Sequence, residues 1–242
     1  MTTETRRIVV NGLPVQIVRK DIKNLHLGVY PPHGRVRVAA PLRVSDNAVR
    51  LAVISKLAWI RRQQARFDGQ PRQSEREMVS GESHYFLGRR YRLRFIPSCG
   101  PAKVIVGRPG AMELHARADL TADQRERVLL SWYRQQLKEL IPPLLEKWQD
   151  AVGVRPQEWA IRKMKTKWGA CNVEARRVWL NLELVKKPVQ CLEYIIVHEL
   201  VHLLARRHDD TFNQLMNKVL PQWRTRRAEL NAAPLAHETW SY

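Results

Sequence analysis

The sequence predicts an α+β protein in two parts. Residues 1–118 are expected to form a β-rich domain with one long helix, and residues 119–242 a mainly helical domain with a short antiparallel sheet. Three observations predict this division. Apolar residues alternate with polar ones in the first third, they recur at helical spacing in the last third, and 44% hydrophobic residues in a chain of 242 supply a core. We identify no internal repeat in the sequence.

Turn signals divide the N-terminal part into strands. Asn11-Gly12 lies between two apolar runs and is a strong hairpin dipeptide. Ser45 or Asp46 can cap a helix that we expect to continue to about Phe67, since its apolar residues recur at helical spacing. The expected strands lie within residues 8–20, 25–41, 83–96 and 104–116.

The character of the chain changes near residue 119. Residues 120–153 predict a helix capped by Thr121, which Pro142 and Pro143 are expected to kink or restart. Two strands are expected within 161–171 and 176–185. A helix beginning at Pro188 and a last helix from about Asp210 to Pro221 complete the prediction.

Charge and cysteine content narrow the class of protein. The formal net charge of +19 favours anionic partners, although a basic protein without such a partner is an equal alternative. No apolar stretch approaches the ~18 residues of a membrane helix, and the first residues lack the apolar core of a secretory signal. Three widely spaced cysteines argue against a disulfide scaffold. We therefore expect a cytoplasmic protein with no membrane partner.

The chemistry is concentrated in one helical segment, where His198, Glu199 and His202 form the pattern H-E-x-x-H. Residues four apart lie on one face of a helix, so both imidazoles can bind one Zn²⁺ ion. Glu199 can then reach a water molecule on the metal and accept its proton. The spacing predicts one catalytic zinc ion in each chain.

A catalytic zinc ion needs a third protein ligand, and His208 is the candidate. On an uninterrupted helix its side chain would point away from His202, so the helix must end or bend after about Ala205. Two other interpretations were weighed: histidines on the surface of an ordinary helix, and a purely structural zinc ion. Surface histidines fit less well, because the motif lies among apolar residues. A structural zinc ion fits less well, because Glu199 would then have no chemical role.

Residues 163–212 resemble the YgjP-like metallopeptidase family, also called the domain of unknown function 45 family, and are similar to the SprT-like and WLM zinc proteases. The family's K-T-R-W-G-S-C block corresponds to residues 165–171, with Lys167 for arginine and Ala170 for serine. The resemblance implies a zincin-like catalytic domain behind a small β-rich domain, with His198, His202 and His208 as zinc ligands. The resemblance supports the assignment of a metal-dependent hydrolase better than it supports the assignment of any one substrate.

The resemblance also places the strand before the motif beside the metal. There, Arg162, Lys165 or Lys167 can face a developing oxyanion or a substrate phosphate, although a solvated strand is the alternative for each. Trp168 can contact substrate or only pack, and Tyr194, one turn before His198, can reach the rim of the site or belong to the core.

Three functions remain open at this point. The first is a zinc-dependent peptidase acting on a protein or peptide, with Glu199 as general base. The second uses the same metal site to hydrolyse a nucleotide. The third is a nucleic-acid-associated protease or binding module, suggested by the SprT-like resemblance and by arginines that can face a phosphate backbone. These arginines are Arg61, Arg62, Arg66, Arg89, Arg90, Arg92, Arg94, Arg224, Arg226 and Arg227.

Overall fold

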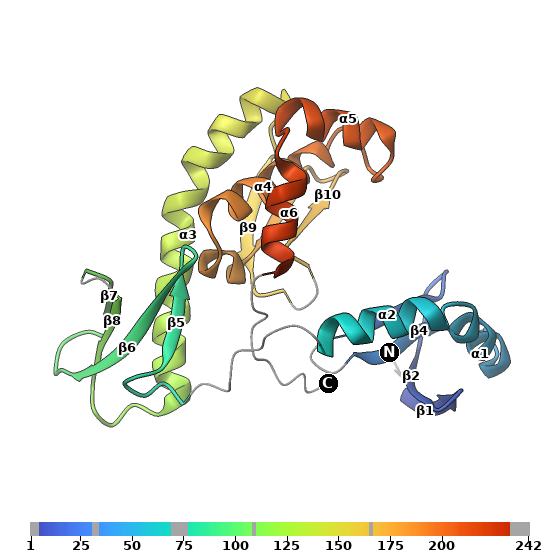
Figure 1. Cartoon of the computed structure of the whole chain (residues 1–242), viewed down its shortest axis with the longest axis horizontal. Helices are drawn as coiled ribbons and strands as arrows, with labels where there is room; N and C mark the ends of the chain where they lie inside the picture. Colours follow the sequence, from blue (N-terminus) through green and yellow to red (C-terminus); the bar gives the residue numbers. More distant parts are fainter. Residues whose placement is uncertain (1–4, 31–33, 69–76, 108–109, 165–166, 233–242) are drawn as a thin grey trace. The chain divides into compact units, whose positions relative to one another are not determined.

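The computed structural model describes residues 5–30, 34–68, 77–107, 110–164 and 167–232. Within these ranges the protein is a mixture of α and β structure, with six α-helices and three small sheets (Figure 1). The described residues up to 68 form one compact unit and those from 77 onward form another; we call them the N-terminal and C-terminal units. No described helix has the length and apolar character needed to cross a membrane.

The N-terminal unit is a four-stranded sheet followed by two helices. The outer pairs of the sheet are antiparallel and the central pair, β2 with β4, is parallel, giving the order β1-β2-β4-β3. Its elements are β1 (Thr5–Val10), β2 (Leu13–Lys20), β3 (His26–Tyr30), β4 (Arg35–Pro41), α1 (Asp46–Ser55) and α2 (Leu57–Asp68). The prediction of one long helix was wrong, because the chain turns at Lys56, whose N–H donates to the carbonyl of Val53.

The C-terminal unit begins with a second sheet of the same topology, order β5-β6-β8-β7. Its elements are β5 (Ser83–Phe86), β6 (Arg89–Pro97), β7 (Lys103–Ile105) and β8 (Ala111–Ala116), followed by α3 (Ala122–Val152). Helix α3 continues through Pro142 and Pro143, so these prolines do not restart it as the sequence suggested.

The two sheets are related by a constant offset of 76 residues. The left-handed turn glycines Gly12 and Gly34 correspond to Gly88 and Gly110, and the helix cap Ser45 corresponds to Thr121. Each hairpin turn also begins with a non-glycine residue at φ 48°, Asn11 or Leu87. The chain therefore contains one ββββα arrangement twice, and the expectation of no internal repeat was wrong at the level of structure. We call residues 5–68 the first copy and residues 83–152 the second copy.

The division into units also differs from the expected boundary at residue 118. The second copy belongs to the C-terminal unit because its core is continuous with the rest of that unit. Buried Leu93, Met112 and Leu114 of the sheet join Leu129 and Tyr133 of α3 in one hydrophobic cluster with the helices that follow. The chain divides between residues 68 and 77, before the second sheet rather than after it.

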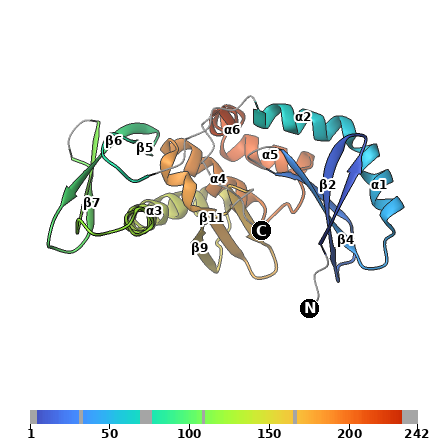
Figure 2. The ribbon, with the colours of Figure 1, turned by 90° about the horizontal axis from the view of Figure 1, so that it is seen from below.

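The remaining elements surround a small mixed sheet. Strand β11 (Arg177–Asn181) pairs antiparallel with β10 (Gly169–Asn172) and parallel with β9 (Glu158–Arg162), so the sheet is not purely antiparallel as expected. Helix α4 (Val189–Val201) packs against this sheet (Figure 2). The last elements are the 3₁₀ helix η1 (Leu182–Lys186), α5 (Asp210–Val219) and α6 (Trp223–Ala232), of which α6 has no counterpart in the prediction.

Candidate metal centre

Helix α4 holds the first two histidines of the motif on one face. Its other sides are buried in the hydrophobic cluster of the C-terminal unit, which fixes the direction of the exposed face. The rings of His198 and His202 lie with centroids 4.8 Å apart, as expected for residues one turn apart. Regular helix ends at Val201 and His202 is its C-cap, so the chain turns four residues earlier than the sequence analysis required.

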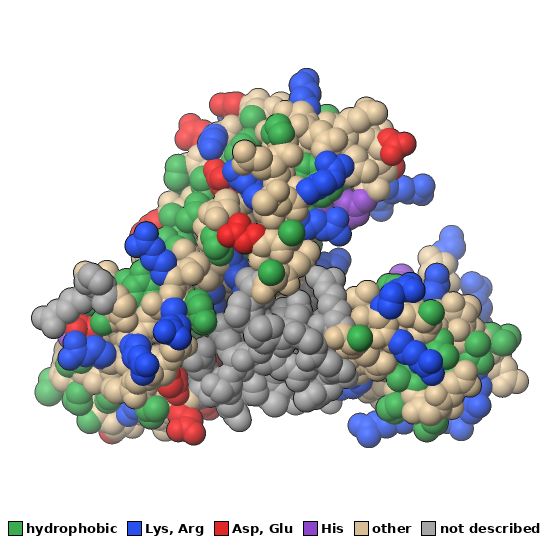
Figure 3. Space-filling view, viewed as in Figure 1, with side chains coloured by type: hydrophobic (Ala, Val, Ile, Leu, Met, Phe, Trp, Pro, Cys, Tyr) green, Lys and Arg blue, Asp and Glu red, His purple; other side chains and the backbone are tan. Residues whose placement is uncertain are grey.

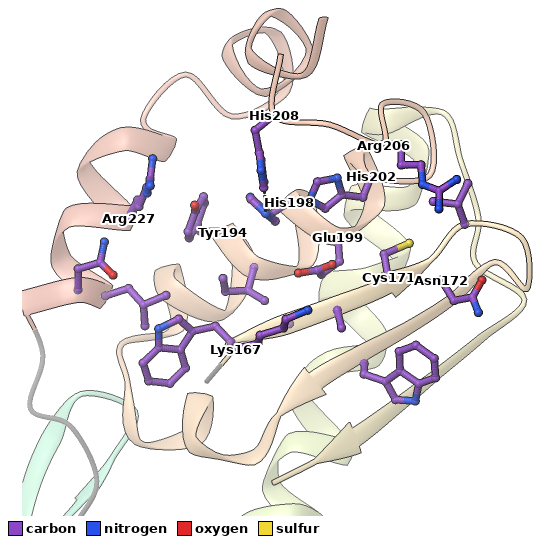
Figure 4. A pocket seen from close by; sticks show the side chains of 18 of the residues that line it. Lys167, Cys171, Asn172, Tyr194, His198, Glu199, His202, Arg206, His208 and Arg227 are labelled. Atoms are coloured by element: carbon purple, nitrogen blue, oxygen red, sulfur yellow. Dashed lines mark hydrogen bonds between the residues drawn. The ribbon is translucent and has the colours of Figure 1, made fainter. Parts of the chain in front are cut away.

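This early turn brings His208 back to the other two histidines. Its Nε2 atom lies 3.1 Å from Nε2 of His198, and one ring nitrogen from each of the three residues lies within 4.8 Å of the others. Two ligands on a tetrahedral Zn²⁺ ion with bonds of ~2.0–2.1 Å are separated by about 3.3 Å. The His198–His208 separation is close to this value, and the three imidazoles lie near enough together to hold one metal ion (Figure 4).

The surroundings of His198 and His202 favour the neutral imidazole, which is the form that binds metals. Burial, together with the neighbouring His202 and His208, lowers the pKa of His198 to about 3. Burial also lowers the pKa of His202. The Nδ1 atom of His202 lies 3.1 Å from the carbonyl oxygen of Ala205, so an Nδ1–H tautomer leaves the Nε2 lone pair free. Phe212 packs against all three rings, with centroids 4.7–5.0 Å away.

Glu199 lies between the histidines and the edge strand β10. Its side chain is buried, and burial raises its pKa to about 8, against a smaller lowering by the charge of Lys167. A Cβ atom on Gly169 would lie 2.4 Å from Oε1 of Glu199, so only glycine allows the strand and the carboxylate to approach this closely. The carboxylate faces the same space as the triad (Figure 4).

A cleft of about 800 Å³ opens over the triad. Of the predicted substrate-binding residues, Lys167, Trp168 and Tyr194 line it. Arg162 lies outside the lining, with its guanidinium 4.7 Å from the ring centroid of Trp179. Lys165 falls outside the described residues.

The side chain of Asn181 positions the loop before β10. Its amide donates to the carbonyls of Met164 and Lys167, each at 2.7 Å, and its Oδ1 accepts from the backbone of Glu183. Asn181 therefore fixes the backbone at Lys167 beside the cleft. These bonds join the end of β11 to the backbone before β10 and after β9.

Three further residues line the cleft: Cys171 of β10, Arg206 after α4 and Arg227 of α6 (Figure 4). The sequence did not assign either arginine to the site. Arg227 was considered only as part of a basic patch, because no spacing in the sequence connects α6 with the motif. The contact of α6 with α4 brings this arginine to the site.

Three comparisons with known proteins were made. The YgjP-like metallopeptidase domain model matches residues 23–233. Among solved structures, the chain is similar to the metallopeptidase zymogen abylysin of Pyrococcus abyssi, with 23% identity over 37% of this chain and 90% of that chain, and a TM-score of 0.35. The comparison with curated proteins gives no match.

Proposed function

Since this chain belongs to the YgjP-like metallopeptidase family, as the match over residues 23–233 shows, we propose that it is a zinc-dependent peptidase with its metal on His198, His202 and His208. The observation that carries the proposal is the convergence of three imidazoles beside a buried carboxylate. Zinc, bound to three histidines, supplies the Lewis acidity that polarises a peptide carbonyl and makes a water molecule acidic near neutral pH.

Glu199 acts as the general base in this proposal. A carboxylate takes a proton from the attacking water and then passes it to the amine that leaves when the peptide bond breaks. The burial that raises the pKa of Glu199 makes its carboxylate a stronger base than an exposed one. Gly169 keeps the space in front of the carboxylate open, and the edge strand β10 runs alongside.

Lys167, Trp168 and Tyr194 remain proposed substrate contacts, since they line the cleft around these groups. Arg162 lies outside the lining and is a weaker candidate. Nucleotide hydrolysis would use the same metal site, so the two functions are distinguished by comparing hydrolysis of nucleotides with hydrolysis of peptides. The family match favours the peptide.

The test combines metal content with hydrolysis. We expect one zinc per chain in the purified protein, loss of casein and fluorogenic-peptide hydrolysis with a chelator, and recovery with added zinc. Glu199→Gln should keep the zinc and lose about 100-fold or more in kcat. His202→Ala should lose the zinc. Glu146→Gln, an exposed carboxylate on α3, is the matched control.

Full activity in Glu199→Gln would overturn the assigned base. Hydrolysis of nucleoside triphosphates by the zinc-loaded protein, without cleavage of any protein or peptide, would favour the nucleotide alternative. Zinc retained at full occupancy in His202→Ala would overturn the ligand set.

A further inference from the structure

The cleft over the triad is lined by three cations that come from three separate elements. Lys167 lies before β10, Arg206 follows α4 and Arg227 belongs to α6. In Figure 4 they surround the histidines and Glu199 from different sides, with Arg206 beside His202, Arg227 beside Tyr194, and Lys167 pointing toward Glu199. A substrate bound in the cleft over the triad would therefore lie near these charges.

Ion pairs hold some of the cations of the C-terminal unit. Arg226, one residue before Arg227 on the same helix, binds Glu193 at 2.8 Å, and Lys186 binds Glu183 at 2.7 Å. Within the ranges that the structure describes, Lys167, Arg206 and Arg227 form no ion pair. The charges of these three cations are therefore not neutralised by ion pairs, and the charge of Lys167 acts on Glu199.

Acidic residues near the cleft do not balance this charge. Among the residues that the structure describes, Glu174 is the only carboxylate of the lining besides Glu199. Asp209 and Asp210 follow His208 but do not line the cleft, and the carboxylate of Asp209 accepts a hydrogen bond from the backbone N–H of Phe212 as the cap of α5. In the space-filling view, Lys and Arg side chains flank the histidine surface of the C-terminal unit (Figure 3).

A concave site lined by one sign of charge attracts ligands of the opposite sign and discriminates against ligands of the same sign. We propose that the cleft selects peptide segments carrying Asp or Glu on both sides of the bond that is cleaved, with Lys167, Arg206 and Arg227 as the residues that determine this specificity. This proposal rests on the proposed peptidase function and names its substrate class. A peptide segment is favoured over a nucleic acid because the family match is to a peptidase domain.

The first experiment uses fluorogenic peptides of one length that differ only in charge. The residues on both sides of the scissile bond are Asp and Glu, Asn and Gln, or Lys and Arg. We expect the zinc-loaded wild-type protein to cleave the acidic peptide with a kcat/KM on the order of tenfold or more above that of the basic peptide at low salt. The preference should shrink at 0.5 M salt, about where the screening length falls to a few ångströms. Mass spectrometry of a digested peptide library finds the cleavage sites without a chosen sequence.

The second experiment changes the cations. Arg206→Gln combined with Arg227→Gln should reduce the ratio of acidic to neutral peptide cleavage several-fold, chiefly through KM. Arg207→Gln is the matched control, since Arg207 is exposed and adjacent to Arg206 but does not line the cleft, and it should leave both the ratio and the rate unchanged.

The possible outcomes test the preference for acidic peptides and the peptidase function separately. Equal cleavage of acidic and basic peptides, or an unchanged ratio in the double variant, would overturn the inference and leave the peptidase intact. Absence of cleavage of every peptide by the zinc-loaded protein would overturn the proposed function itself. If a single-stranded oligonucleotide competes with the acidic peptide more strongly than an acidic peptide of equal charge does, the site is selected for phosphates and the inference is wrong.

Discussion

The two ββββα copies have the same topology but different surroundings. In the first copy the hairpin turn at Asn11 and Gly12 is exposed, and a Cβ atom on Gly12 would meet nothing within 4 Å. In the second copy the N–H groups of Leu87 and Gly88 donate to the carbonyls of Val185 and Lys186, and a Cβ atom on Gly88 would lie 2.7 Å from Pro188. The same turn is thus a free loop in one copy and a docking point in the other.

The helices show why the copies differ. Helix α3 extends to Val152 and carries buried Leu137 and Ile141 into the core that it shares with α4. The positions 76 residues earlier are Arg61 and Ala65, both exposed. The ββββα arrangement therefore shares a core with α4 in the copy whose helix continues with an apolar face, and not in the copy whose helix is polar at the equivalent positions.

The largest effect should come from shortening equivalent core residues. Val38 and Leu114 are related by the offset and both are fully buried. Leu114→Ala should destabilise the C-terminal unit by about 2–5 kcal/mol, and Val38→Ala should destabilise the N-terminal unit by about 2 kcal/mol. Hydrogen exchange with mass spectrometry reports both units in one sample. Loss of protection across residues 77–232 in Val38→Ala would mean that the units unfold together, contrary to the division described.

Lys187 is buried and lies between Lys186 and Pro188, which contact the hairpin turn of the second copy. We therefore expect the stability of the C-terminal unit to depend on pH. Burial lowers the pKa of Lys187 to about 8, from about 10.5 in the unfolded chain. Between these values the unfolded chain binds more protons, so the free energy of unfolding rises with pH. Lys187→Met should therefore be more stable than wild type by up to ~3 kcal/mol at pH 7, with the difference disappearing near pH 10.5.

Urea unfolding at pH 7, 8.5 and 10 measures this difference. Lys138→Met, an exposed lysine of α3, is the control and should show no such trend. A Lys187→Met protein that is less stable than wild type at pH 7 would show that the contacts of the charged side chain, including the Trp168 ring at 5.5 Å, outweigh its burial.

Local patterns predicted much of this molecule, and long-range contacts account for what was missed. The hairpin at Asn11, the caps at Ser45 and Thr121 and the histidine pair depend on neighbours within about four residues, which the sequence displays directly. The repeat was hidden because interchangeable apolar residues fill equivalent core positions, such as Val36 and Met112. Arg227 could not be assigned to the site, since only the packing of α6 on α4 joins it to the motif.

Replacing the turn glycines by alanine should produce a smaller difference in stability between the two copies. Gly12 and Gly88 both have positive φ, so alanine costs about 1–2 kcal/mol of strain at either position. Gly88→Ala must also displace Pro188, so its cost should exceed that of Gly12→Ala by roughly 1 kcal/mol or more. Urea unfolding monitored separately in each unit by hydrogen exchange gives both values. Equal costs would contradict the docking of the second turn.

The smallest difference lies in the helix caps. Thr121 and Gln124 form a complete capping box: the Thr121 N–H donates to Gln124 Oε1 at 2.8 Å, and the Gln124 N–H donates to Thr121 Oγ1 at 3.3 Å. Ser45 accepts from the N–H of Ala48 at 3.2 Å, but alanine has no side chain to return the bond. Gln124→Ala should therefore cost a few tenths to about 1 kcal/mol, and Ala48→Gln should stabilise the first copy by a similar or smaller amount. Because Ala48 is exposed, the longer side chain meets no core, and thermal unfolding of the Ala48→Gln protein tests the gain directly. A destabilised Ala48→Gln protein would mean that the chain before α1 does not present its N–H as the second copy does, and the equivalence of the two copies would end at the helix.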